Sequence, residues 1–242
     1  MSADTIVLPS GKTATLAATP TLTTPDDQTP KKVPVENGRA VAFFIGGAGD
    51  KKSYYFSGPY GNITFARDPF DQRVHAAGKK DRYTSHYLGY DEAKGSEVKK
   101  LIIANIPNKA TPVYIVGHSL GGWNGAHLSA LLTDQGYKVE MLVTLDPVGE
   151  GTLVRLGSDI YHGRPAPKST FWINVRATPT KSNASDSVAS FGEQWNIESG
   201  PDINHRLNTN HENAKAMFFE SLNDGMSAAD YVYESILSYT SR

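Results

Sequence analysis

Three continuous apolar runs constrain the fold of this chain more than any other feature of its sequence. They read AVAFFIGG at residues 40–47, TPVYIVGHS at 111–119 and VEMLVTLDPV at 139–148. Runs of this kind are typical of strands buried on both faces, as in parallel sheets that carry helices on each side. RYTSHYLGY at 82–90 and STFWINVRATP at 169–179 are aromatic and β-branched, so they are also predicted as strands.

Helix-like segments follow these strands. Residues 91–108 begin with acidic residues and place Val98, Leu101, Ile102 and Ile106 at helical spacing. Residues 120–135, 212–224 and 227–240 are predicted as further helices. Alternating strands and helices predict an α/β domain in which helices flank both faces of a mostly parallel central sheet.

The first 37 residues have a different character. They are rich in Thr, Pro, Lys and Asp, which predicts an N-terminal tail or covering segment with one short strand at 5–8, before a single domain at 38–242. They lack the basic start and apolar core of a secretory signal, and no apolar run approaches the roughly 20 residues that span a bilayer. We therefore expect synthesis as a soluble cytoplasmic protein without a transmembrane segment.

Composition argues against several functions. A formal net charge of −1 and scattered Lys and Arg residues do not predict nucleic-acid binding. The sequence has no Cys, which excludes disulfides, thiolate metal sites and a cysteine nucleophile. Its His and carboxylate residues show no metal-ligand spacing such as H-E-x-x-H, so neither a metal nor another cofactor is predicted.

The strongest functional motif is Gly117-His118-Ser119-Leu120-Gly121, which fits G-x-S-x-G between a predicted strand and a predicted helix. In such a turn the serine adopts a strained backbone, and small neighbours let the strand and the helix approach each other. The strain exposes the hydroxyl at the carboxyl edge of the sheet. Ser119 is therefore the predicted nucleophile.

A serine nucleophile requires a base and an orienting acid, which should follow it in the order acid, then histidine. Asp146 ends the next strand, in VTLDPV, and is the favoured acid; Asp186 in SNASDSV is the alternative. His211 directly precedes a predicted helix and is the favoured base, with His205 as the alternative.

Two loops complete the predicted site. The oxyanion is expected to bind the backbone N–H of Leu120 and that of Ala48 or Gly47, in the glycine-rich loop at residues 46–49. Residues 51–72 are read as an aromatic loop that forms either a lid or acyl-binding wall over Ser119, or a small satellite core. The candidate lid residues are Tyr54, Tyr55, Phe56 and Tyr60.

These motifs resemble the α/β-hydrolase superfamily, and in particular its lipases. GHSLGG at 117–122 is similar to the lipase and esterase nucleophile elbow, TLDPVGEG at 144–151 to an acid-bearing loop, and TNHENA at 209–214 to a histidine loop. The GGAGD loop departs from the usual His-Gly start of the oxyanion loop. A small lipase without cysteine also resembles bacterial effectors of type VI secretion, which would imply export by that route, secretion machinery and an immunity protein as partners.

The sequence thus predicts a serine hydrolase of carboxylic esters, with a small-molecule or lipid ester as substrate and peripheral contact with a membrane. Lipid and phospholipid esters are the favoured substrates. A thioesterase or amidase using the same triad is one alternative. A non-catalytic binding scaffold is the other.

Overall fold

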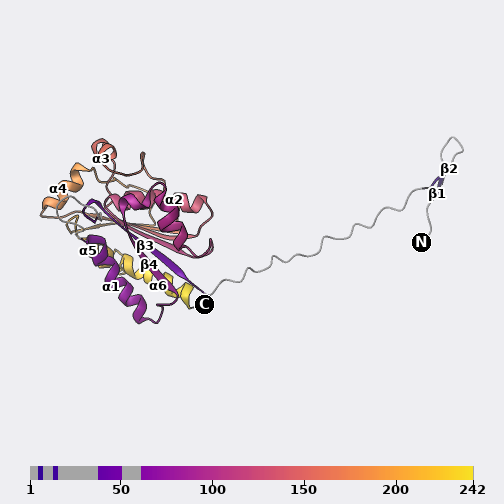
Figure 1. The fold of residues 1–242 in the computed structure, drawn as a ribbon, viewed down its shortest axis with the longest axis horizontal. Coiled ribbons are helices and arrows are strands. Elements are labelled where there is room, and N and C mark those ends of the chain that lie inside the picture. The colour runs from indigo at the N-terminus through magenta and orange to yellow at the C-terminus, as the bar shows by residue number, and fades with distance from the viewer. Residues whose placement is uncertain (1–4, 8–12, 16–37, 51–60, 242) are drawn as a thin grey trace. The chain divides into compact units, whose positions relative to one another are not determined.

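The computed structural model describes residues 5–7, 13–15, 38–50 and 61–241. The chain divides into two compact units, residues 1–34 and 35–242. In the first unit, β1 (Thr5–Val7) pairs with β2 (Thr13–Thr15) in antiparallel fashion. The second unit contains the remaining elements (Figure 1).

A six-stranded parallel sheet forms the centre of the second unit. Its strands are β3 (Ala40–Gly46), β4 (Tyr83–Gly89), β5 (Val113–His118), β6 (Val139–Leu145), β7 (Phe171–Ala177) and β8 (Ile203–Leu207). They lie in the order β4-β3-β5-β6-β7-β8, and every neighbouring pair is parallel. This is the parallel α/β arrangement that the sequence predicts. The strand order reverses between β3 and β5, and ligands of open α/β sheets bind at such a point, beyond the carboxyl ends of the strands.

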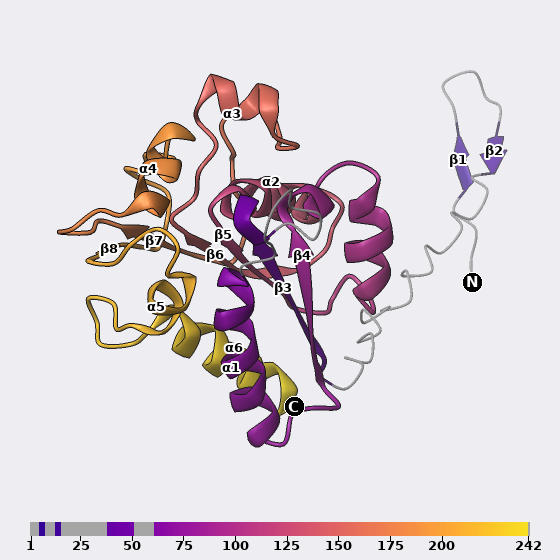
Figure 2. The ribbon, with the colours of Figure 1, turned by 60° about the vertical axis from the view of Figure 1, so that its left-hand side comes forward.

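Helices cover both faces of the sheet (Figure 2). One face carries α1 (Asn62–Ala76), α5 (Ala214–Phe219) and α6 (Ala228–Thr240). The other carries α2 (Leu120–Asp134) and the segment that follows β4. The short helices α3 (Thr152–Gly157) and α4 (Ala184–Phe191) follow the carboxyl ends of β6 and β7.

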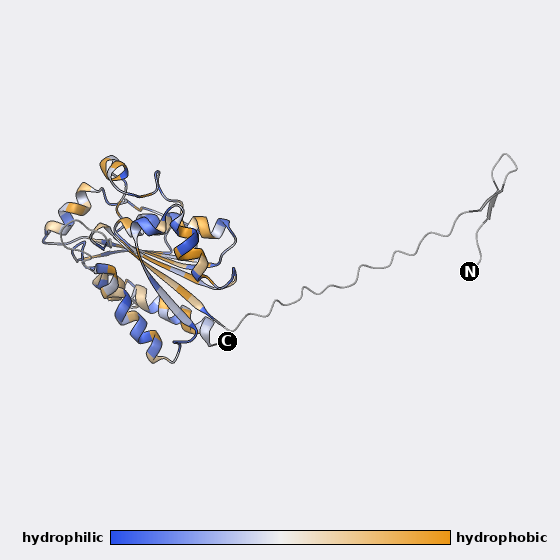
Figure 3. Cartoon of the chain, in the orientation of Figure 1, coloured by the Kyte–Doolittle hydropathy of each residue, from blue (hydrophilic) through white to orange (hydrophobic). Residues whose placement is uncertain are grey.

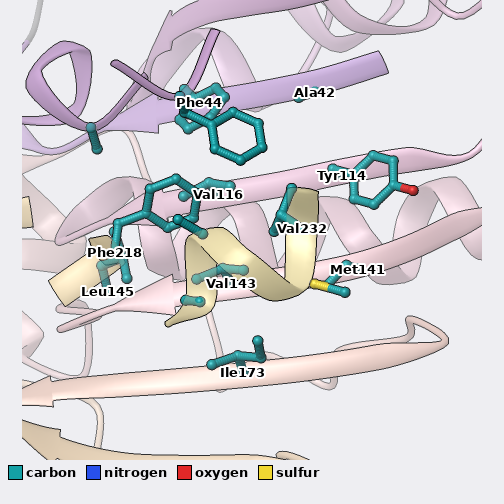
Figure 4. Packing of buried hydrophobic residues seen from close by; sticks show 14 of the residues in the cluster. Ala42, Phe44, Tyr114, Val116, Met141, Val143, Leu145, Ile173, Phe218 and Val232 are labelled. Carbon is teal, nitrogen blue, oxygen red and sulfur yellow. The ribbon is translucent and has the colours of Figure 1, made fainter. Parts of the chain in front are cut away.

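Alternate residues of each central strand supply the two apolar cores. In β3, Ala42 and Phe44 belong to the core under α1, α5 and α6, whereas Phe43 and Ile45 belong to the core under α2. Figure 4 shows the first core, where Phe44 and Phe218 lie with their ring centroids 5.9 Å apart. Burial on both sides explains why β3, β5 and β6 read as continuous apolar runs.

The structure corrects the sequence-based prediction in several segments, among them the following. Residues 61–72, read as part of a loop, belong mostly to α1, which contains Pro69 and buries Ile63, Ala66, Phe70 and Val74. Residues 91–108 do not form one helix. They contain 3-10 and π turns, and Gly95 has a left-handed φ of 63°. The strand β8 was not predicted, because an edge strand in which exposed and half-buried residues alternate has no apolar run.

Among the described residues, no helix is both long and apolar enough to cross a membrane.

Candidate active site

Ser119 occupies the tight turn between β5 and α2. Its backbone has φ 56° and ψ −126°, a strained conformation for a residue other than glycine. A Cβ on Gly117 would lie 2.4 Å from the carbonyl oxygen of Gly121, and one on Gly121 would lie 2.2 Å from that of Ile45. Only glycine fits at these two positions, so the backbone packing that the motif implies is present here.

A hydrogen-bonded chain of three side chains begins at Ser119. Its Oγ lies 3.0 Å from Nε2 of His211, and Nδ1 of His211 lies 2.6 Å from Oδ2 of Asp146. All three residues are buried. An ionised carboxylate can only accept, so Nδ1 of His211 donates to Asp146 and Nε2 is left to accept the Ser119 hydroxyl proton. The arrangement is that of a serine next to an oriented base.

Asp146 directly follows β6, the strand next to the one that ends before Ser119. The register of β5 and β6 pairs His118 with Leu145, so the next residues, Ser119 and Asp146, leave neighbouring strand ends. Asp146 has a left-handed φ of 44°. The backbone N–H of Ala177 donates to its Oδ1 at 3.2 Å.

Gln194 also contacts Asp146, and sequence reasoning missed it. Its Nε2 lies 2.8 Å from Oδ1 and 2.7 Å from Oδ2 of the carboxylate. Gln194 is in the segment after α4, outside any recognised motif, so no sequence signal marked it.

The backbone of His211 is held on both sides. Its N–H donates to Oδ1 of Asp186 at 2.9 Å, and its carbonyl oxygen lies 2.7 Å from Nε2 of His118, which must donate. The two imidazole rings lie 4.9 Å apart. Burial, together with the nearby His211, lowers the pKa of His118 to about 3, so this ring is neutral at neutral pH.

The alternative acid and the alternative base lie away from the Ser119 hydroxyl. Asp186 is in the first turn of α4, where it accepts the N–H of Asn183 and binds the backbone of His211. Burial acts to raise the pKa of Asp186, but hydrogen bonds from Asn183, Asn210 and His211 lower it overall. His205 is on β8, with its Nδ1 3.0 Å from Oδ1 of Asn223.

Gly47 and Leu120, two of the predicted oxyanion residues, lie next to Ser119. A Cβ on Gly47 would be 2.6 Å from Cβ of Ser119, so this part of the loop after β3 passes directly against the serine. Ala48 follows and opens a 3-10 turn that ends at Asp50. Leu120 is the first residue of α2, where backbone N–H groups have no acceptor within the helix. N–H groups placed in this way can face a developing negative charge.

A buried carboxylate anchors the loop after β3. The side chain of Asp50 accepts the backbone N–H groups of Asn62 and Ile63 at the start of α1, both at 2.8 Å. Burial raises the pKa of Asp50 against the opposing effect of these hydrogen bonds. Sequence reasoning missed this role, because α1 was not predicted.

The candidate lid residues Tyr54, Tyr55, Phe56 and Tyr60 lie outside the described residues. In the part of the chain that the structure describes, no cluster of three or more His, Asp or Glu side chains could hold a metal ion.

Comparisons with known proteins leave the function to be argued from this geometry. No family model matches the sequence, and no curated protein matches it. A type II thioesterase of the yersiniabactin NRPS/PKS biosynthetic pathway, YbtT, is similar in structure, with a TM-score of 0.43 and 10% sequence identity. The match covers 85% of this chain and 94% of the thioesterase.

Proposed function

We propose that this protein is a serine hydrolase that cleaves carboxylic esters through an acyl-enzyme. The observation that carries the proposal is the buried hydrogen-bonded chain from Ser119 through His211 to Asp146. The strained backbone at Ser119 supports it, because strain of this kind persists where the surrounding structure enforces it and clusters at active sites.

In the first half of the proposed reaction, Oγ of Ser119 attacks the ester carbonyl while Nε2 of His211 takes its proton. Asp146 holds the imidazole in the required tautomer and stabilises the cation that forms. The backbone N–H groups of Leu120 and of Ala48 or Gly47 stabilise the oxyanion. His211 then protonates the leaving alcohol, and the acyl group remains on Ser119.

In the second half, water replaces the alcohol. His211 takes a proton from the water as it attacks the acyl carbonyl, and the same N–H groups stabilise the second tetrahedral intermediate. Collapse of that intermediate returns the proton to Ser119 and releases the carboxylic acid. Every proton transfer passes through one nitrogen, Nε2 of His211.

The surface near the triad supports lipid-like esters as substrates. In the described part of the chain, the large hydrophobic side chains that are exposed lie on α1, α3 and α4, which follow the carboxyl ends of β3, β6 and β7. They are Phe65, Leu153, Leu156, Val188 and Phe191, exposed by 61–78%. Figure 3 shows apolar residues on α3 and α4. The helix α3 follows the loop that begins with Asp146, and Asp186 on α4 accepts the backbone N–H of His211.

We infer that the apolar side chains of α3 and α4 contact a lipid surface. Leu153 and Leu156, like Val188 and Phe191, are three residues apart and so share a face of their helix. The four side chains present on the order of 500 Å² of apolar surface. A standard protein–protein interface uses about 800 Å² from each partner, so these four side chains offer too little surface for a stable dimer.

The first test replaces the nucleophile. Ser119→Ala should reduce hydrolysis of a short p-nitrophenyl ester by at least about 1000-fold. The exposed Ser238→Ala variant is the matched control and should retain full activity. Ester hydrolysis unchanged by Ser119→Ala would overturn the proposal.

Two further measurements separate the alternatives. Covalent labelling of Ser119 by a fluorophosphonate distinguishes an enzyme from a binding scaffold, because an unactivated serine does not react. Rates on matched ester, thioester and amide substrates with the same acyl group then identify the preferred bond.

The lipid contact has its own test. The double variant Leu156→Ser, Phe191→Ser, made on the Ser119→Ala background so that lipid is not consumed, should lose most binding to phospholipid vesicles in a flotation assay. With Ser119 intact, the same double variant should hydrolyse a soluble short-chain ester within about twofold of the wild-type rate, because the hydrogen bonds of the triad are untouched. Unchanged vesicle binding would contradict the lipid contact and leave the ester hydrolase proposal standing.

A further inference from the structure

The carboxylate of Asp146 accepts hydrogen bonds from other groups in addition to His211. Besides Nδ1 of His211, its carboxylate accepts the N–H of Ala177 and faces Nε2 of Gln194, which lies within 2.8 Å of both oxygens. Asp146 is fully buried. A buried carboxylate keeps its charge only when such donors replace the water that it has lost.

We propose that Gln194 is a positioning residue that orients the Asp146 carboxylate toward His211 while His211 carries the transferred proton. This inference rests on the proposed function. It extends the hydrogen-bonded chain of Ser119, His211 and Asp146 by one residue, contributed by the segment between α4 and β8.

The environment of Gln194 sets the orientation of its amide. On one side its nitrogen faces the two carboxylate oxygens, which can only accept. On the other side its Oε1 lies 3.4 Å from Nη2 of Arg176, which can only donate. The reversed amide would set oxygen against oxygen at Asp146 and nitrogen against nitrogen at Arg176. Gln194 therefore donates to Asp146.

The backbone around Gln194 is attached to the loop that follows Asp146. The N–H groups of Gly149 and Glu150 both donate to the carbonyl oxygen of Glu193 at 3.1 Å. Val148 and Gln194 form an isolated antiparallel bridge, and the N–H of Trp195 donates to the carbonyl oxygen of Pro147 at 2.8 Å.

Glu193, immediately before Gln194, has a left-handed φ of 55°. A residue other than glycine holds this conformation at a cost, which the surrounding hydrogen bonds must offset. The strained backbone of Glu193 and the hydrogen bonds of the neighbouring residues fix the position of the Gln194 backbone, and therefore of its Cα.

A neutral donor suits this position. The negative charge of Asp146 stabilises the imidazolium that forms on His211 when Ser119 attacks. A Lys or Arg in direct contact with the carboxylate would oppose that charge, whereas an amide satisfies the oxygens and leaves it in place. The guanidinium of Arg176 instead faces Oε1 of Gln194.

The test compares two substitutions at Gln194. Gln194→Met keeps the approximate volume of the side chain and removes the donor; it should lower kcat roughly 10- to 100-fold and change KM little. Gln194→Glu places a second carboxyl group beside Asp146, and the negative charge of Asp146 raises the pKa of the introduced carboxyl group. Below that pKa the introduced group is protonated and donates to Asp146 as the amide does. The deficit of Gln194→Glu should therefore widen as pH rises, while that of Gln194→Met should not.

Asn196→Leu is the matched control. Asn196 lies on the same segment and accepts from Nη1 of Arg176 at 3.1 Å, but its side-chain hydrogen bonds go to Arg176 and Glu198 instead of to Asp146. It should keep kcat within about twofold of wild type. The downfield proton resonance of the bond between His211 and Asp146 should shift in Gln194→Met and stay in place in Asn196→Leu.

The outcomes separate this inference from the proposed function. If Ser119→Ala abolishes activity and Gln194→Met retains wild-type kcat with an unshifted resonance, the positioning role is wrong and the hydrolase proposal stands. If Ser119→Ala retains full ester hydrolysis, the hydrolase proposal fails, and the positioning role fails with it. A Gln194→Met protein that melts like wild type but has low kcat supports the positioning role, because a purely structural contact would lower the melting temperature.

Discussion

Gly121 leaves no room for a side chain, because α2 crosses β3 at this residue. A Cβ there would lie 2.2 Å from the carbonyl oxygen of Ile45, and backbone cannot move away as a flexible side chain can. We expect Gly121→Ala to lower the free energy of unfolding by about 3 kcal/mol, measured by denaturant titration. Gly157→Ala is the control, since its Cβ would meet no atom within 4 Å. Equal stability of the two variants would contradict this account of the turn.

Individual residues of the candidate site could be proposed from the sequence where a local pattern marked them. Ser119 lies in a five-residue motif, Asp146 directly follows an apolar strand, and His211 directly precedes a predicted helix, three residues before α5 begins. Gln194 and Asp186 act through hydrogen bonds to residues 48 and 25 positions away in the chain. The contact of His118 with the backbone of His211 likewise joins residues 93 apart. Pairings at such separations follow from the folded topology and leave no trace in one sequence.

At the scale of elements, Asp50 joins the loop after β3 to the first turn of α1. An asparagine offers one acceptor oxygen where the carboxylate offers two, so Asp50→Asn leaves the N–H of Asn62 or of Ile63 without its partner. We expect the free energy of unfolding to fall by about 1–2 kcal/mol. The same change should lower kcat for ester hydrolysis, because Gly47 in that loop lies against Ser119.

Asp68→Asn provides the comparison for Asp50→Asn. Asp68 is also on α1, but its carboxylate is exposed and pairs with Arg67 at the surface. An exposed pair contributes about 0–1 kcal/mol, so this variant should be close to wild type in both measurements. If Asp50→Asn loses stability and keeps its kcat, Asp50 caps α1 without organising the oxyanion loop.

Elements were predictable in proportion to their burial. The strands β3, β5 and β6 are buried on both faces and therefore carry an unambiguous apolar run. By contrast, α1 contains Pro69, and the burial of four apolar side chains against the sheet outweighs the roughly 3 kcal/mol that an internal proline costs. In residues 91–108 the prediction of one helix was wrong: Val98 and Ile102 are buried, but the segment forms 3-10 and π turns, and Gly95 has a left-handed φ.

At the scale of the whole molecule, the sheet separates two apolar cores and the candidate site occupies its carboxyl edge. Alternate residues of β3 and β5 supply opposite cores, and the polar residues Ser119 and Asp146 follow directly after the carboxyl ends of β5 and β6. The polar groups that the edge buries, His118 among them, must then be satisfied or kept neutral. The stability of the whole domain is therefore expected to depend on pH.

His118 is one buried group whose pKa makes the stability of the domain depend on pH. Burial and the neighbouring His211 lower its pKa from 6.5 to about 3, against the opposing effects of its hydrogen bond to the His211 backbone and of Asp146. The unfolded chain protonates this imidazole below about pH 6.5, whereas the folded protein does so only near pH 3. In that interval the unfolded state binds the extra proton, so stability falls as pH falls through it. One pKa unit corresponds to about 1.4 kcal/mol, which makes the expected loss several kcal/mol.

His118→Phe isolates that contribution, because phenylalanine keeps an aromatic ring next to His211 and cannot be protonated. Denaturant unfolding of both proteins at pH 7 and at pH 4 gives the loss of stability on acidification for each. Other groups also titrate in this range. The lowered pKa values of Asp186 and Asp230 add to the loss of stability, whereas the raised pKa of Asp50 opposes it. Both proteins contain these groups, so their contributions cancel when the two losses are compared. We expect the variant to lose less stability than wild type between these pH values. Equal losses would mean that His118 carries a proton in the folded protein at pH 4, which its burial and its proximity to His211 oppose.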